Sequence, residues 1–136
     1  MDRKIYLPIF LPDVEQAQDP ELELLSEEIF LPEVAADPAL RLALYELAWL
    51  NVSLMHGPME LAWFSEKSRY LVFLELSSDS STRPAMLQDL GIEPMKNLPF
   101  ARAGQRIVWA SDNSDSIVPA FQAMASQIEA WEDARL

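Results

Sequence analysis

The sequence predicts an α+β fold with an antiparallel sheet, a central apolar helix and a C-terminal amphipathic helix. Three observations predict this class: an apolar segment with marked helix ends at residues 38–55, two aromatic-rich runs at 59–64 and 70–76, and helical spacing of apolar residues over 116–134. The chain has 136 residues, of which 50% are hydrophobic and 24% are charged. We therefore expect one globular domain spanning residues 1–136.

Residues 38–55 carry helix signals at both ends. Asp37 is a suitable N-cap, Pro38 fits the first helical position, and Gly57 followed by Pro58 provides a stop. One apolar stripe consists of Leu40, Leu44, Leu47 and Leu54, and a second stripe on another face consists of Leu42, Tyr45, Trp49 and Val52. A small domain cannot easily bury a helix that is apolar nearly all round, so we expect a homodimer whose interface contains the second stripe.

The two aromatic-rich runs predict a β-hairpin, because residues 65–69 between them are polar. Residues 71–74 lack polar alternation, which predicts a central strand covered on both faces. Alternate positions of the two predicted strands are occupied by Leu61, Trp63, Leu71 and Phe73. These side chains would share one face, which is a candidate partner-binding surface; packing under the closing helix is the alternative.

The closing helix is predicted at residues 116–134, with Asp115 or Ser114 as its cap and Pro119 in its first turn. Its narrow apolar seam consists of Ile117, Phe121, Met124, Ile128 and Trp131. We therefore expect one side of this helix to pack and the rest to contact water.

Four other segments give weaker signals. Residues 4–11 alternate like a strand, but their prolines confine it to an edge or an irregular path. Residues 21–34 fit a strand and a helix equally, residues 84–90 are a short helix candidate, and residues 105–110 predict a further strand. No internal repeat is apparent.

The charge excludes several classes of function. Ten basic and twenty-two acidic residues give a net charge of −12, which disfavours binding to nucleic acids and to anionic membranes. The acidity lies at the chain ends, which suits a solvated rim or attraction of a basic partner. No membrane span or signal peptide is recognisable. The absence of cysteine removes disulfides and thiolate chemistry and favours a cytoplasmic location.

No residues form a recognisable catalytic or metal-binding motif. His56 is the only histidine and lies at the predicted helix end, where a capping role is favoured over catalysis. Glu27 and Glu28 could bind a cation or exchange protons, but a solvated acidic face is favoured. The three glycines are too far apart to form a phosphate-binding loop. We therefore expect no enzyme activity, no cofactor and no metal.

Residues 42–51 (LALYELAWLN) and 54–63 (LMHGPMELAW) resemble the class I chaperones of bacterial type III secretion. In that family a helix ending in a Leu-x-Leu-Asn-like phrase leads into an antiparallel hairpin, and an amphipathic helix closes the chain. The resemblance implies a homodimer that holds the unfolded N-terminal segment of a secreted effector along apolar grooves and sheet edges. Two departures are the strand-like start of the chain and the additional residues 77–111.

Three functions therefore compete. The first is non-catalytic binding of an extended segment of a secreted effector, which remains competent for secretion. The second is an acidic immunity protein or inhibitor that neutralises a toxin or mimics nucleic-acid charge. The third is an enzyme, for which no nucleophile and base are found. Charge placement discriminates between the first two, because a charge mimic spreads carboxylates over a surface, whereas a chaperone keeps apolar grooves beside them.

Overall fold

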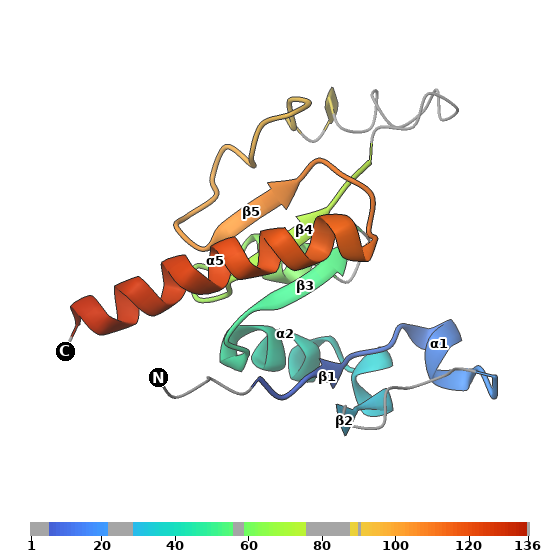
Figure 1. Ribbon diagram of the computed structural model, residues 1–136. Coiled ribbons are helices and arrows are strands. Elements are labelled where there is room, and N and C mark those ends of the chain that lie inside the picture. The colour runs from blue at the N-terminus through green and yellow to red at the C-terminus, as the bar shows by residue number, and fades with distance from the viewer. Residues whose placement is uncertain (1–5, 22–28, 56–58, 76–87, 90, 136) are drawn as a thin grey trace. The chain divides into compact units, whose positions relative to one another are not determined.

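The computed structural model describes residues 6–21, 29–55, 59–75, 88–89 and 91–135 (Figure 1). The chain divides into two compact units, residues 1–44 and 45–136, which we call the N-terminal unit and the sheet unit. Helix α2 (Pro38–Leu47) crosses the boundary between them. Whether the two units form one folding domain stays a prediction.

The N-terminal unit is built on two very short parallel strands, β1 (Ile9–Phe10) and β2 (Ile29–Phe30). Strand β1 lies within the predicted strand at 4–11. β2 and the 3-10 helix η1 (Pro32–Ala35) occupy part of the ambiguous segment 21–34, of which residues 22–28 are outside the described residues. Helix α1 (Val14–Gln18) follows β1 and begins with a reciprocal capping box between Asp13 and Gln16.

Helix α2 begins where the sequence predicts and ends eight residues earlier. The carboxylate of Asp37 accepts a hydrogen bond from the N–H of Leu40 at 3.0 Å, which confirms the predicted cap. The predicted continuation to residue 55 is wrong, because residues 51–54 form strand β3 (Asn51–Leu54). The buried amide of Asn51 donates to the carbonyls of Tyr45 at 2.8 Å and Arg69 at 2.9 Å, so it joins the end of α2 to the start of the next strand.

The predicted hairpin at residues 59–76 is also wrong. Its first half is helix α3 (Glu60–Trp63), and its second half is strand β4 (Tyr70–Phe73). The Ser68 hydroxyl donates to the Ala62 carbonyl at 2.5 Å, which closes the turn after α3. Strands β3, β4 and β5 (Gln105–Val108) form a parallel sheet in the order β3-β4-β5. The α+β class is therefore confirmed, but the strands are parallel because helical segments or long connections separate them.

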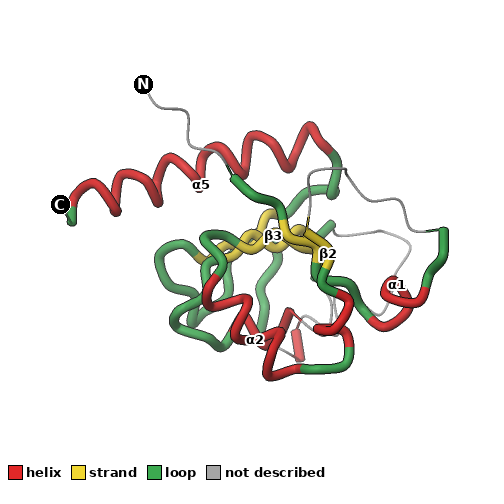
Figure 2. Tube along the Cα trace, turned by 90° about the horizontal axis from the view of Figure 1, so that it is seen from below, coloured by secondary structure: helices red, strands yellow, loops and turns green. Residues whose placement is uncertain are grey.

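Strand β4 is central and all four of its residues are buried, as the sequence predicts. Helix α5 (Ser114–Ala134) lies along one side of the sheet (Figure 2) and confirms the predicted closing helix, with Asn113 rather than Asp115 or Ser114 as its N-cap. The core between them consists of Leu71, Phe73, Met124 and Ile128. Strand β5 confirms the strand expected at 105–110, whereas most of the helix candidate at 84–90 lies outside the described residues.

Candidate protein-binding surfaces

The predicted partner-binding face does not exist on the sheet. Leu61 and Trp63 lie on α3 rather than on a strand, and Trp63 is buried. Leu71 and Phe73 are only 0% and 2% exposed and pack beneath α5, which is the alternative that the sequence left open. The expectation that these four residues share a face on adjacent strands is therefore wrong.

The predicted dimer stripe is divided among different elements because α2 ends at Leu47. Leu42 and Tyr45 lie on α2, and Tyr45 is buried. Trp49 follows the helix, packs against the core and donates its ring N–H to the Glu132 carboxylate at 2.8 Å. Val52 lies on β3 and is 42% exposed. Of the stripe, Val52 is the residue best placed to meet another chain.

The N-terminal unit exposes a pair of isoleucines on its small sheet. Ile9 lies beside Ile29 on one face, and both side chains are exposed. Phe10 and Phe30 occupy the other face, with their rings stacked at a centroid distance of 5.7 Å. The other exposed large apolar residues of this unit are Tyr6, Leu7, Val14 and Leu40.

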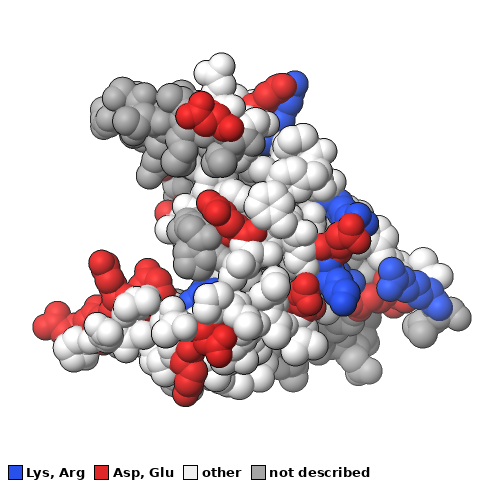
Figure 3. Space-filling model, turned by 180° about the vertical axis from the view of Figure 1, so that it is seen from behind, with Lys and Arg blue, Asp and Glu red and all other residues white. Residues whose placement is uncertain are grey.

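The same unit holds most of the uncompensated negative charge. Its ten acids and three bases give −7 over residues 1–44, whereas twelve acids and seven bases give −5 over residues 45–136. Among its described residues Arg41 is the only base; it is buried and donates to the carbonyls of Val34 and Pro12. Figure 3 shows acidic side chains over one face of the molecule, several of them with no basic side chain beside them.

None of the described acids of the N-terminal unit forms an ion pair with another described residue. They are Asp13, Glu15, Asp19, Glu21, Glu33 and Asp37, all of which are exposed. In the sheet unit, by contrast, Glu66 pairs with Arg102 at 2.6 Å, Glu132 pairs with Arg69 at 3.5 Å, and Glu93 pairs with Lys96.

Exposed apolar and acidic side chains lie close together at two places in the N-terminal unit. Val14 is exposed between Asp13 and Glu15 at the start of α1. Leu40 is exposed one turn after Asp37, whose carboxylate caps its N–H. At these two places apolar surface therefore lies beside carboxylates.

The sequence reasoning missed this surface because it overlooked a repeat. Residues 9–14 read IFLPDV and residues 29–34 read IFLPEV, so the statement that no repeat is apparent is wrong. The offset of twenty residues is also the offset of the β1 and β2 pairing, in which Ile9 faces Ile29. A self-comparison of the sequence at this offset would have found the pair of strands.

The two edges of the sheet in the sheet unit differ. Along β5, the Asn97 side chain accepts from the N–H of Ile107 at 3.0 Å and donates to the carbonyl of Gln105 at 2.7 Å, so it takes the place of a further strand. Along β3, Asn51 and Met55 donate toward β4, which turns the backbone groups of Val52 and Leu54 outward. Among the described residues no backbone group pairs with this edge.

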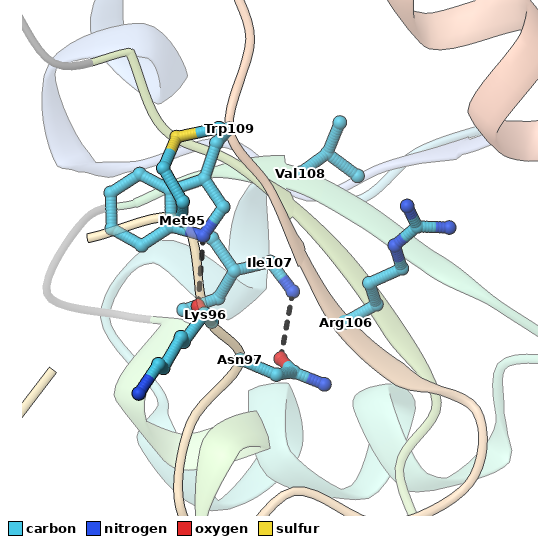
Figure 4. Close-up of a pocket in the computed structure, with 7 residues that line it drawn as sticks. All are labelled: Met95, Lys96, Asn97, Arg106, Ile107, Val108 and Trp109. Carbon is cyan, nitrogen blue, oxygen red and sulfur yellow. Dashed lines mark hydrogen bonds between the residues drawn. The ribbon is translucent and has the colours of Figure 1, made fainter. Parts of the chain in front are cut away.

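A cavity of about 430 Å³ lies between residues 95–97 and residues 106–109 (Figure 4). Met95 lies over the ring of Trp109, whose N–H donates to the Lys96 carbonyl at 2.8 Å. The side chains of Lys96 and Arg106 point in different directions, and Lys96 is paired with Glu93. Because its two cations do not converge, the cavity has no evident anion-binding arrangement.

The described residues contain no group of three or more His, Cys, Asp or Glu side chains that could hold a metal ion. His56, Glu27 and Glu28, the residues considered for chemistry, lie outside the described residues. Burial raises the pKa of Tyr70 to about 12, so this phenol stays protonated at neutral pH. In the part of the chain that is described, no helix has both the length and the apolar character needed to cross a bilayer.

Comparisons with protein-family profiles, with curated proteins and with solved structures found no match to this chain.

Proposed function

We propose that the protein is a non-catalytic, chaperone-type binder that holds an extended, positively charged segment of another polypeptide, such as a secreted effector. The observation that carries this proposal is the surface of the N-terminal unit, which exposes both apolar side chains and carboxylates that pair with no described cation. Apolar contacts would provide affinity, and the carboxylates would attract the basic segment and speed its encounter.

An extended partner fits this surface better than a folded one. The pairing of β1 with β2 turns the backbone groups of Ile9 and Phe30 outward, and no described residue bonds them. A two-stranded sheet of this size is marginal in water, so an added strand would stabilise it. Such a strand gains backbone hydrogen bonds while its alternate side chains meet Ile9 or Ile29.

The proposal rests on this surface chemistry and not on the resemblance to secretion chaperones. The antiparallel hairpin that the resemblance implies is absent from residues 59–75, which form α3 and β4. An acidic inhibitor shares the charge of this protein but would bind a folded basic partner, and the experiment below separates the two.

We further propose that the protein is a homodimer joined along β3 rather than along α2. Two copies related by a two-fold axis at Ser53 would pair Val52 of each copy with Leu54 of the other, through four backbone hydrogen bonds. The edge has no charged side chain, and the nearby Glu132 is paired with Arg69, so little local repulsion opposes this contact. The edge is short, which predicts a weak dimer.

The binding proposal is tested by calorimetry with an unstructured peptide in which lysine alternates with leucine. We expect binding with a negative heat-capacity change and a partial loss of affinity at high salt. The double variant Ile9→Ser, Ile29→Ser should weaken binding about tenfold or more. The matched control Leu47→Ser, Val118→Ser alters two residues that are 81% and 49% exposed in the sheet unit and should change little.

A peptide in which serine replaces every leucine is the second arm of this experiment. If it binds as tightly as the leucine peptide, the interaction is purely electrostatic and the acidic-inhibitor function replaces the chaperone function. Tight binding to a folded basic domain, with no binding to either peptide, would likewise favour the acidic-inhibitor function.

A further inference from the structure

The N-terminal unit contains one six-residue phrase twice. IFLPDV at residues 9–14 and IFLPEV at residues 29–34 are identical at five of six positions. Strands β1 and β2 pair in parallel, with Ile9 opposite Ile29 and Phe10 opposite Phe30, so the first two residues of the copies are paired in register. The chain itself therefore demonstrates that a strand with this phrase pairs with another strand of the same phrase.

The two-stranded sheet has two outer edges. The N–H groups of Ile29 and Leu31 donate to the carbonyls of Pro8 and Phe10 at 3.0 and 3.2 Å, so these groups face inward. The backbone groups of Ile9 and Phe30 face outward. Units that repeat in register bury their apolar faces against further copies, and two copies leave both outer edges open.

The fifth position of the phrase determines which copy could be added. It is Asp13, the cap of α1, in the first copy and Glu33, in η1, in the second. Both lie beyond the paired strand residues and are exposed without an ion pair to a described residue. A third acid at the equivalent position would add like-charge repulsion, whereas a lysine or arginine would relieve it. The unit as a whole has a net charge of −7, which acts in the same direction.

We propose that the partner segment carries a related phrase with a base at the fifth position, in the pattern aliphatic, aromatic, aliphatic, proline, lysine or arginine, aliphatic. This segment adds in parallel to the outer edge of β2, on the side of Glu33, and extends the Phe10 and Phe30 stack. The inference rests on the proposed function and specifies the sequence of the segment that is bound.

The test uses three short synthetic peptides, one with IFLPKV, one with IFLPEV and one with the residues of the first in scrambled order. We expect the lysine peptide to bind at least about tenfold more tightly than either of the others. If the scrambled and ordered lysine peptides bind equally, this inference fails while the proposed function stands. If none binds, and the alternating lysine and leucine peptide also fails, the proposed function itself is lost.

A charge-reversed protein provides the decisive variant, because Glu33 is exposed and its side chain forms no ion pair with a described residue. Glu33→Lys should reverse the preference, so that the IFLPEV peptide binds more tightly than the IFLPKV peptide. The control Glu15→Lys makes the same charge change in the same unit outside the phrase and should keep the original order. An unchanged order in Glu33→Lys, or the same reversal in both variants, contradicts the proposed register. A further outcome would also contradict this inference. If the wild-type chain self-associates and Glu33→Lys self-associates more strongly, the segment bound at this edge is a second copy of the chain.

Discussion

The side chain of Asn97 bonds the outer edge of β5 by accepting a hydrogen bond from the N–H of Ile107 at 3.0 Å. Its amide nitrogen also donates to the carbonyl of Gln105 at 2.7 Å, so one side chain satisfies the two backbone groups that a neighbouring strand would bond. The structure therefore protects one edge of the sheet, whereas along β3 no described backbone group pairs with the edge and the Ser53 hydroxyl donates to the carbonyl of Leu54 at 2.8 Å.

Asn97→Ala should destabilise the protein by about 1–3 kcal/mol, because it removes both bonds from partly buried backbone groups. Chemical denaturation monitored by circular dichroism measures this change. Asn97→Asp keeps the acceptor for Ile107 and loses the donor to Gln105, so it should show an intermediate loss. A variant as stable as the wild type would mean that water replaces the side chain without cost.

The open β3 edge predicts a homodimer. In sedimentation velocity the average mass should rise above the monomer mass of 15.4 kDa as the protein concentration increases. Salt should strengthen this dimer, because it screens the repulsion between two chains of net charge −12. Val52→Lys should abolish it, whereas Val118→Lys, at a residue of similar exposure on α5, should not. A monomer at every concentration would refute the dimer.

Leu71 provides a test of whether the predicted partner-binding residues are core residues. Leu71→Ala should cost about 2–5 kcal/mol of folding free energy, because this side chain is fully buried under α5. Leu54→Ala, on the neighbouring strand and 48% exposed, should cost much less. A loss of peptide binding by Leu71→Ala at unchanged stability would restore the original prediction.

The raised pKa of Tyr70 predicts how the stability of the sheet unit depends on pH. Its folded pKa of about 12 lies above the ordinary value of 10.0, so the unfolded chain ionises first as the pH rises. Stability should be constant below pH 10 and fall between pH 10 and 12 by up to about 3 kcal/mol. Alkaline denaturation of the wild type and of Tyr70→Phe should show this fall in the wild type only.

At neutral pH the same substitution should leave the protein as stable or make it more stable by about 1 kcal/mol, because no described residue bonds the Tyr70 hydroxyl. Thermal denaturation provides the comparison. Destabilisation of the variant would show that the hydroxyl does have a partner.

The elements that the sequence predicted correctly are those whose signals are local. The cap at Asp37, the apolar seam of α5 and the uninterrupted apolar run of β4 each lie within one segment. Strand β3 was missed because Val52 and Leu54 continue the helical spacing of α2. The Asn51 amide, at the start of β3, donates to the carbonyls of Tyr45 and Arg69. Because Arg69 is eighteen residues away, a local sequence pattern does not reveal this contact.

The candidate site was missed for a related reason. Residues 60–63 are aromatic-rich and favour a strand by composition, yet they form α3, so the face assigned to them does not exist. The surface that replaces it is built on Ile9 and Ile29. Its two-residue strands are too short for a periodicity argument, but the repeat itself was readable in the sequence.

Charge variants test where the basic segment binds. Glu15→Gln with Glu33→Gln removes two carboxylates of the N-terminal unit that form no ion pair with a described residue. Glu66→Gln with Glu93→Gln removes two exposed carboxylates that are paired with Arg102 and Lys96 in the sheet unit. Both double variants change the net charge equally, so any difference between them reports position.

Ionic strength then separates local from overall attraction. The screening length is about 30 Å at 0.01 M salt and about 8 Å at 0.15 M, so both double variants should weaken binding of the lysine and leucine peptide alike at low salt. At 0.15 M only carboxylates close to the bound segment still contribute, and each such contact is worth about 0.2–1 kcal/mol. The N-terminal double variant should therefore bind the peptide roughly two- to thirtyfold more weakly at 0.15 M salt, because it loses two such contacts, while the sheet-unit double variant should lose almost no affinity. Equal losses by the two variants at 0.15 M would place the segment away from the N-terminal unit.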